Sequence, residues 1–166
     1  ATIGEHGGTV FKTMGDGILA EFASVVAAVE WSARLQRSLY NEPIAMPGGE
    51  TLRLRAGIIM ADVMMEGTDR FGEGVNLAVR VQGCAPPGGL AISKWMHEYL
   101  VGKVDLSFTD IGSQSLKNIA NTIRIFIWHP DANVQRRMAT EYASHKQGPG
   151  PASQRPSVAV LPYDNM

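Results

Sequence analysis

The sequence has a single cysteine, Cys84, in 166 residues. One thiol cannot form an internal disulfide, and it cannot by itself make a thiolate metal site. This scarcity excludes a disulfide-stabilised scaffold and is typical of a reducing compartment. We therefore expect a cytoplasmic location.

Long hydrophobic runs are also missing. No stretch approaches the roughly 18 consecutive apolar residues that a membrane-spanning helix needs. Residues 1–8 lack the basic region and apolar run of a secretory signal. The sequence thus predicts no membrane segment within this chain.

An excess of charge of one sign is absent as well. The formal net charge is -1, and no cluster of lysine and arginine occurs. Nucleic-acid-binding surfaces depend on concentrated basic charge, so we expect no nucleic-acid partner. With 45% hydrophobic and 19% charged residues, the chain instead has the composition of one ordinary globular domain with a single core.

The pattern of residues 9–22 predicts a β-hairpin with Gly15-Asp16-Gly17 as its turn. A carboxylate then lies at the tip, and Lys12 lies four residues before it. This placement suits a metal-nucleotide site. Asp and Gly are also the residues that hairpin turns prefer for local reasons, so the hairpin alone does not decide between the two interpretations.

The remaining periodicity predicts alternating helices and strands in irregular order. Helices are expected over 24–41 with Ser24 as the cap, over 75–84, over 93–101 and, more weakly, over 130–146. One or two strands are expected over 51–65, and single strands over 90–93, 104–110 and 123–128. Such an order favours an α+β sheet with helices packed on one face.

The end of the chain changes character. Residues 147–156 are rich in glycine, proline, serine and glutamine, which is linker composition. Residues 157–162 form an apolar, strand-like run, which we expect to have nothing to pair against within this chain. We expect a domain boundary here and a fragment of a longer protein.

Two polar side chains share one face of the helix predicted over 75–84. Asn76 and Arg80 are four residues apart, so an amide and a guanidinium project together. The preceding loop carries Asp69 and two glycines. Taken singly, these features equally describe a solvated helix face and an ordinary connection.

The order of these motifs is more specific than any one of them. Residues 12–17 (KTMGDG), 55–58 (RAGI), Asp69, 75–80 (VNLAVR) and 116–119 (LKNI) together resemble the catalytic domains of class III nucleotidyl cyclases. The resemblance spans residues 5–128. It implies a ferredoxin-like α/β sandwich with a mostly antiparallel sheet, which dimerises head to tail.

The resemblance implies a role for each matching residue. Asp16 corresponds to one of two aspartates that hold a pair of Mg²⁺ or Mn²⁺ ions. Arg80 corresponds to the residue that stabilises charge on the α-phosphate, and Asn76 to the one that orients the ribose. The expected cofactors are therefore two divalent ions per site.

Lys12 and Asp69 correspond to the pair that reads the purine. An ammonium donates to adenine N1 and a carboxylate accepts from the 6-amino group, so this pair favours ATP over GTP. Lys117 corresponds to a triphosphate contact. In this family the metal carboxylates and the other site residues come from different subunits, which implies a homodimer with two equivalent sites.

The sequence departs from the family pattern at its start. The first metal aspartate of the family lies upstream of the hairpin, and no Asp precedes Asp16 here. We expect an amino-terminally truncated bacterial cyclase domain over 1–130 that is inactive alone, followed by a helix and linker over 131–156. Residues 157–166 resemble the opening strand of a TolB-like domain, so further domains are expected in the full-length protein.

The sequence therefore predicts an adenylate cyclase catalytic domain, which makes cyclic AMP and pyrophosphate from ATP. Three alternatives remain open at this stage. The first is a guanylate or relaxed-specificity cyclase. The second is a non-catalytic nucleotide-binding or dimerisation module that regulates another domain, and the third is a generic ferredoxin-like interaction domain.

Overall fold

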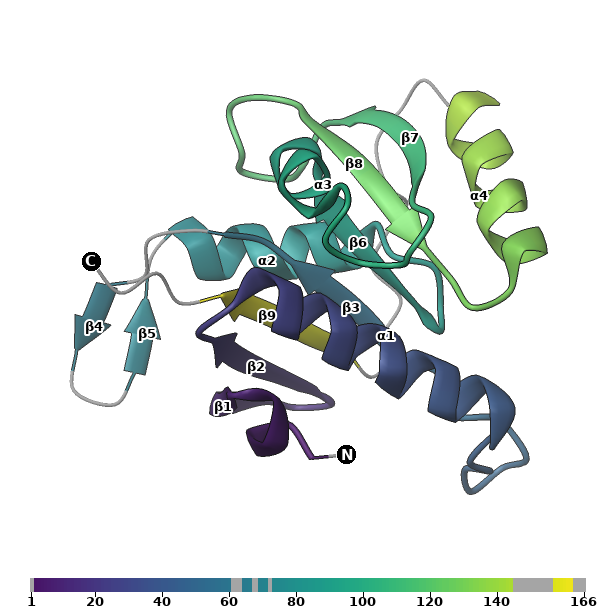
Figure 1. Cartoon of the computed structure of the whole chain (residues 1–166), viewed down its shortest axis with the longest axis horizontal. Coiled ribbons are helices and arrows are strands. Elements are labelled where there is room, and N and C mark those ends of the chain that lie inside the picture. Colours follow the sequence, from purple (N-terminus) through teal and green to yellow (C-terminus); the bar gives the residue numbers. More distant parts are fainter. Residues whose placement is uncertain (1, 61–63, 67–68, 72, 145–156, 163–166) are drawn as a thin grey trace.

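The computed structural model describes residues 2–60, 64–66, 69–71, 73–144 and 157–162. For 64–66, 69–71, 73 and 157–162 it describes the backbone alone. These segments form a mixed sheet with helices against it (Figure 1).

Within the described residues, the main sheet has seven strands. In spatial order they are β1 (Gly8–Met14), β2 (Gly17–Phe22), β9 (Ser157–Pro162), β3 (Arg55–Ile58), β6 (Gly89–Ser93), β8 (Ile123–Trp128) and β7 (Thr109–Gln114). A short pair, β4 (Met64–Glu66) and β5 (Asp69–Phe71), stands apart from it. Among the described strands, four of the seven pairings are antiparallel, which agrees with the predicted α+β class.

The predicted hairpin is present. β1 and β2 pair antiparallel from Gly8 opposite Phe22 to Met14 opposite Gly17, so Gly15 and Asp16 form the connection. Gly15 has a φ of 58°, a left-handed conformation that glycine adopts without steric cost. The local preference of the Gly-Asp-Gly sequence is therefore sufficient to form the turn.

The position of β9 corrects the expectation that residues 157–162 have nothing to pair against. β9 lies between β2 and β3 and runs parallel to both, with Ser157 opposite Gly17 on one side and Arg55 on the other. Figure 1 shows it as the yellow arrow inside the sheet. Its two neighbours do not pair with each other, so β9 makes the sheet continuous.

The helices form where the sequence predicts them. They are α1 (Val25–Asn41), α2 (Glu73–Gly83), α3 (Lys94–Leu100) and α4 (Ala132–Ser144), with a short 3-10 turn η1 (Gly4–His6) before the sheet. The Ser24 hydroxyl accepts a hydrogen bond from the Ala27 backbone N–H at 3.3 Å, which confirms Ser24 as the cap of α1. Ser93 caps α3 in the same way.

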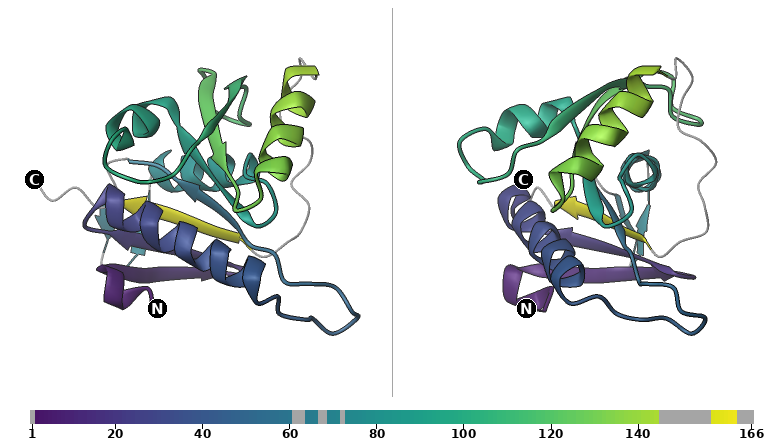
Figure 2. Two further views of the ribbon diagram at one scale, coloured as in Figure 1. Left: turned by 45° about the vertical axis from the view of Figure 1, so that its right-hand side comes forward. Right: turned by 90° about the vertical axis from the view of Figure 1, so that its right-hand side faces the viewer.

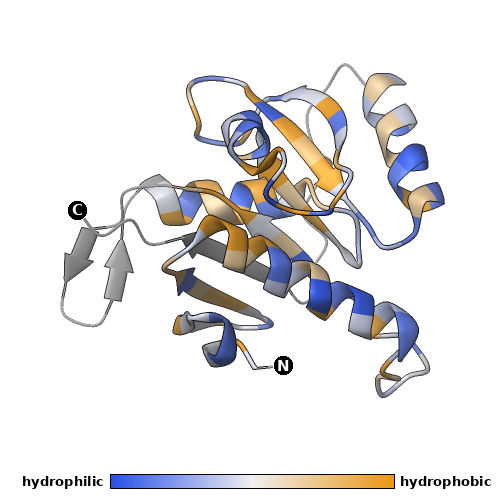
Figure 3. Ribbon diagram, in the orientation of Figure 1, coloured by the Kyte–Doolittle hydropathy of each residue, from blue (hydrophilic) through white to orange (hydrophobic). Residues whose placement is uncertain are grey.

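Helices cover both faces of the sheet, not one face as the sequence suggested. α1 and α2 lie on opposite sides of the strands (Figure 2, right). Figure 3 shows apolar colour along β6 and β8 and polar colour toward the carboxyl end of α1. Alternation along the strands explains the two faces, because neighbouring strand residues point to opposite sides.

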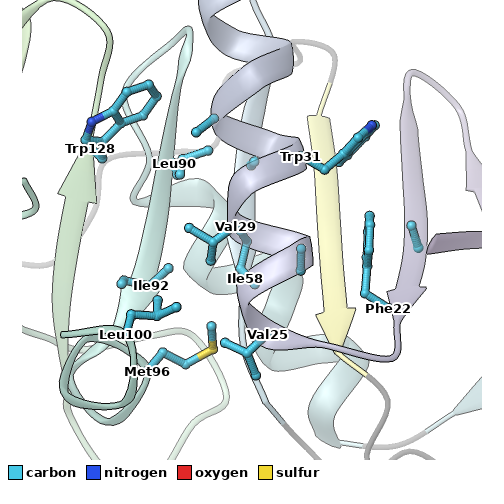
Figure 4. Packing of buried hydrophobic residues seen from close by; sticks show 14 residues of the cluster. Phe22, Val25, Val29, Trp31, Ile58, Leu90, Ile92, Met96, Leu100 and Trp128 are labelled. Carbon is cyan, nitrogen blue, oxygen red and sulfur yellow. The ribbon is translucent and has the colours of Figure 1, made fainter. Parts of the chain in front are cut away.

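Two apolar clusters fill these faces. On one face, Phe22 and Trp31 pack with their ring centroids 5.6 Å apart, beside Val29 and Ile58 (Figure 4). The other cluster lies between α2 and the opposite sides of the strands, and partly buried residues of α4 pack against it. Its buried members are Leu19, Ile59, Ala78, Val81, Cys84, Ala85, Ala91, Ile111, Leu116, Ile125 and Ile127. α2 therefore belongs to the core by one side only, which leaves its other side for chemistry.

Two segments differ from the predicted pattern. β7 begins at Thr109, so residues 104–108 are not a strand, and its pairing with β8 shifts register between Asp110 and Ser113. Residues 69–71, expected in a loop, form β5. Within the described residues, no helix combines the length and apolarity needed to cross a membrane.

Candidate functional site

α2 carries the first two predicted site residues. Ala78 and Val81 are fully buried against the sheet, whereas Asn76 is exposed and Arg80 is half-buried. The spacing of four residues places Asn76 and Arg80 one turn apart on the same side. The apolar stripe of the helix thus determines which side chains remain available.

A glycine brings α2 close to the central sheet. A Cβ added to Gly57 of β3 would lie 2.2 Å from the Gln82 backbone nitrogen and 2.6 Å from the Ala78 carbonyl oxygen. The Arg55 guanidinium also donates to the Gly83 carbonyl at 3.3 Å, which ties the end of the helix to the same strand. The absence of a side chain at Gly57 therefore positions Asn76 and Arg80 relative to the sheet.

Lys117 reaches this region from the connection between β7 and β8. The Ile119 N–H donates to the Leu116 carbonyl at 3.0 Å, so residues 116–119 form a tight turn. Leu116 is 3% exposed and anchors the turn in the core, while Lys117 is exposed. Below the turn, the Arg124 Nε donates to the Asp110 carboxylate at 2.8 Å and joins the two strands.

Asn76, Arg80 and Lys117 line one pocket of about 490 Å³. Its other lining residues are Asn118, Ile119, Ala120, Asn121 and Ile123. Two cationic side chains and three amides face the same space, and none of the described side chains that line it is a carboxylate. A pocket of this volume and charge suits an anionic small molecule with many hydrogen-bond acceptors.

The thiol of Cys84, at the end of α2, is unreactive. Cys84 is fully buried at the end of α2, and its Sγ donates to the Arg80 carbonyl at 3.7 Å. Burial raises the pKa of the Cys84 thiol to about 12. A thiol that stays protonated is neither a nucleophile nor a metal ligand, so the pocket works through its cations and amides.

The proposed purine pair lies on two neighbouring strands. Lys12 is half-buried on β1, Asp69 is the first residue of β5, and these two strands contact each other. The side chain of Asp69 lies outside the described part of the structure. β5 also contacts α2, the helix that carries Asn76 and Arg80.

Asp16 lies apart from the pocket. It is exposed at the tip of the hairpin, and the hairpin forms one edge of the sheet, whereas the turn that carries Lys117 joins the two strands of the other edge (Figure 1). In the described part of the chain, no three His, Cys, Asp or Glu side chains gather to hold a metal ion. Asp16 alone is less than a two-metal site requires, because such a site takes more than one carboxylate.

The sequence analysis missed two lining residues, Asn118 and Asn121. Asn118 could have been found from its place in the Leu-Lys-Asn-Ile motif, directly after Lys117. Asn121 carries no comparable signal, because a polar residue in a loop is unremarkable until the loop is folded against a helix.

Comparison with known proteins gives a consistent result. No family model matches the sequence. A protein of Rhizobium meliloti (strain 1021) named "Putative adenylate cyclase 3" is 42% identical over 164 residues, which are 99% of this chain and 27% of that protein. The chain thus spans 27% of the length of this curated relative.

Solved structures agree. An adenylate/guanylate cyclase/hydrolase from Silicibacter pomeroyi is 32% identical, superimposes with a TM-score of 0.66, and is matched over 78% of this chain and 75% of its own. An adenylate cyclase from Trypanosoma brucei, solved in its monomeric state, shares the fold with a TM-score of 0.54 at 16% identity, over 76% of this chain and 72% of its own.

Proposed function

This chain belongs to the family of adenylate and guanylate cyclase domains, and we propose that it is the catalytic domain of an adenylate cyclase. The reaction converts ATP to cyclic AMP and pyrophosphate. The 3'-hydroxyl of the ribose attacks the α-phosphate, and pyrophosphate leaves from the opposite side of the same phosphorus.

The observation that carries this proposal is the shared pocket of Asn76, Arg80 and Lys117. The planar guanidinium of Arg80 donates to the α-phosphate oxygens, on which charge develops during the attack. Asn76, one turn earlier, orients the ribose so that its 3'-hydroxyl faces the phosphorus. Lys117 places a compact positive charge against the outgoing phosphates.

Purine selection is assigned to Lys12 and Asp69. The contact between β1 and β5 supports this pairing, because it brings the two strands together, and β5 in turn contacts α2. A lysine donor at adenine N1 and a carboxylate acceptor at the 6-amino group match adenine and mismatch guanine. GTP is therefore the disfavoured substrate.

Asp16 is assigned to the second site of a head-to-tail homodimer. Its place at the tip of the hairpin, on the opposite edge of the sheet from Lys117, supports this assignment. Cyclase domains of this family use divalent ions, and Asp16 is the carboxylate that this chain offers to Mg²⁺ or Mn²⁺. Such ions supply charge neutralisation at the phosphates when bound.

The proposal also extends to the whole gene product. The length of the curated relative supports further domains beyond this one. We place the cyclase domain over 1–130 and a connecting helix and linker over 131–156. We assign residues 157–166 to the start of the next domain. In this structure, β9 from that segment pairs within the sheet of the cyclase domain.

A complementation assay on the full-length gene product tests the two-chain site. Asp16→Ala and Arg80→Ala should each remove most cyclic AMP formation. When the two variants are co-expressed, cyclic AMP formation should recover to about a quarter of the wild-type rate. Half of the randomly formed dimers then contain one copy of each variant, and each such dimer has one intact site out of two.

Two controls make the result decisive. Co-expression of Asn76→Ala with Arg80→Ala must stay inactive, since both residues belong to the same half of each site. Failure of the Asp16 and Arg80 variants to complement, with both dimers intact by light scattering, would contradict the shared site. Turnover of GTP in place of ATP would instead favour a guanylate cyclase, and nucleotide binding with no product would favour a regulatory module.

A further inference from the structure

The turn at residues 116–119 holds two adjacent side chains at the pocket. Leu116 and Ile119 belong to the apolar cluster beneath α2 and α4, and their backbone hydrogen bond of 3.0 Å closes the turn. Lys117 and Asn118 are its two central residues, and both are exposed and line the pocket. Buried Leu116 and partly buried Ile119 therefore fix where these two residues lie.

Asn118 has an unusual backbone. Its φ is 64°, and among the described residues it is the one non-glycine residue with a positive φ. Asparagine tolerates this left-handed conformation better than most residues, but glycine adopts it at lower cost. Backbone conformation alone therefore does not favour asparagine over glycine at this position.

The surroundings of Asn118 explain what its side chain can do. Arg80 and Lys117 supply two positive charges to the same pocket, and no carboxylate lines it among the side chains that the structure describes. A polyphosphate presents more acceptor oxygens than two cations can satisfy. An asparagine amide adds two N–H donors without adding charge.

We infer that Asn118 is a phosphate-binding residue, whose amide N–H groups donate to the polyphosphate of the nucleotide beside Lys117. The inference rests on the proposed function for the identity of the phosphate compound. It assigns the charge neutralisation to Lys117 and part of the hydrogen bonding to Asn118. Pyrophosphate, the product, should bind through the same groups.

Substitutions at this one position separate binding from backbone conformation. Asn118→Gly removes the amide and eases the left-handed turn, so the fold should be as stable as the wild type or more stable. Asn118→Asp keeps a residue that tolerates this conformation and replaces the donor with an anion. A purely conformational role predicts that glycine is equal to asparagine or better.

The experiment measures pyrophosphate inhibition and the KM for ATP in the full-length gene product. Loss of hydrogen bonds to a charged ligand should weaken pyrophosphate inhibition about 10-fold in Asn118→Gly, and Asn118→Asp should be weaker again. Asn41→Gly, at the exposed end of α1, is the matched control and should match the wild type. Wild-type inhibition in Asn118→Gly would overturn the inference.

Calorimetry with inorganic pyrophosphate keeps this test separate from the reaction. If the gene product makes no cyclic AMP but binds pyrophosphate more tightly than Asn118→Gly does, the proposed function fails and the assignment of Asn118 stands. If cyclic AMP forms and Asn118→Gly binds pyrophosphate like the wild type, the function stands and the assignment fails. Absence of pyrophosphate binding also overturns it.

Discussion

Ala20 of β2 and Ile58 of β3 pair with the same residue, Val160 of β9. Both neighbours are fully buried, and they belong to the same apolar cluster. The hairpin that carries Lys12 and Asp16 therefore joins the sheet bearing the pocket through a strand from the end of the chain. This arrangement makes β9 a sensitive point of the fold.

A proline at position 160 should destabilise the domain. Proline has no N–H to donate, and β9 has a neighbour on each side. The free energy of unfolding should fall by roughly 1–3 kcal/mol for the hydrogen bond lost and its unpaired partner. Urea denaturation measures it.

Ala132→Pro is the control for that variant. Ala132 is the first residue of α4, where the fixed φ of proline is compatible with the helix and the missing N–H is tolerated. Equal stability of the two variants would show that β9 does not pair in the sheet and would favour its assignment to a following domain.

Gly57→Ala should disturb the contact between β3 and α2. The new Cβ would meet backbone atoms of Gln82 and Ala78, which cannot rotate away as a side chain can. Overpacking of this kind costs roughly 1–3 kcal/mol. Thermal unfolding should show the loss, and the shift of Arg80 should raise the KM for ATP.

Gly83→Ala serves as its matched control. Apart from its chain neighbours and the backbone of its own helix, no described atom lies within 4 Å of a Cβ added there, and the residue ends α2. Alanine is a better helix former than glycine, so this change should be neutral or stabilising by less than about 1 kcal/mol. A destabilised Gly83→Ala would mean that the helix end, not the close approach at Gly57, is sensitive.

Lys12→Glu should weaken the use of ATP. The change replaces the proposed donor to adenine N1 with an acceptor, so the KM for ATP should rise about 10-fold or more while GTP is less affected. Lys103→Glu controls for the change of charge, because Lys103 is exposed and its Nζ lies 3.3 Å from the Tyr99 ring centroid. An unchanged ratio of ATP to GTP turnover would remove Lys12 from purine recognition.

Stability should depend on pH through His129. This side chain is 3% exposed, and burial lowers the pKa of its imidazole below the usual 6.5, although hydrogen bonds to backbone groups oppose that shift. The folded state therefore favours the neutral imidazole, and the contribution of this preference to stability is complete above about pH 6.5. As the pH falls below that value, the unfolded chain takes up the proton more readily, so the free energy of unfolding decreases.

Denaturation at several pH values checks this sign. Between about pH 7.5 and pH 5, a range above the ordinary pKa of carboxylates, the stability of the wild type should fall more steeply than that of His129→Gln. Parallel curves for the two proteins would show that the pKa of His129 is not lowered in the folded state.

Local sequence patterns were enough to predict several elements. The Gly-Asp-Gly turn, the Ser24 cap of α1 and the apolar stripe of α2 depend on neighbours within a few residues, and the structure confirms these elements. The ordered motifs were enough to indicate the family. The roles of the individual residues stay predictions, since geometry alone does not test them.

Long-range contacts explain what the patterns missed. The sequence of β9 reads as an apolar strand, but nothing in it selects β2 and β3 as neighbours. The presence of helices on both faces of the sheet was not predicted, because alternation along a strand does not indicate which helix covers which face. The loop residue Asn118 was missed because its conformation depends on the buried ends of its turn.

The sequence by itself determined the hairpin, the helices and the series of motifs, because each depends on local backbone preference or on residue order. Only the tertiary structure decided that Lys117 shares a pocket with Arg80, and that Asp16 lies at the other edge of the sheet. The physical reason is that sheet order is set by burial of apolar surface between segments distant in sequence. Spacing along the chain does not encode that order.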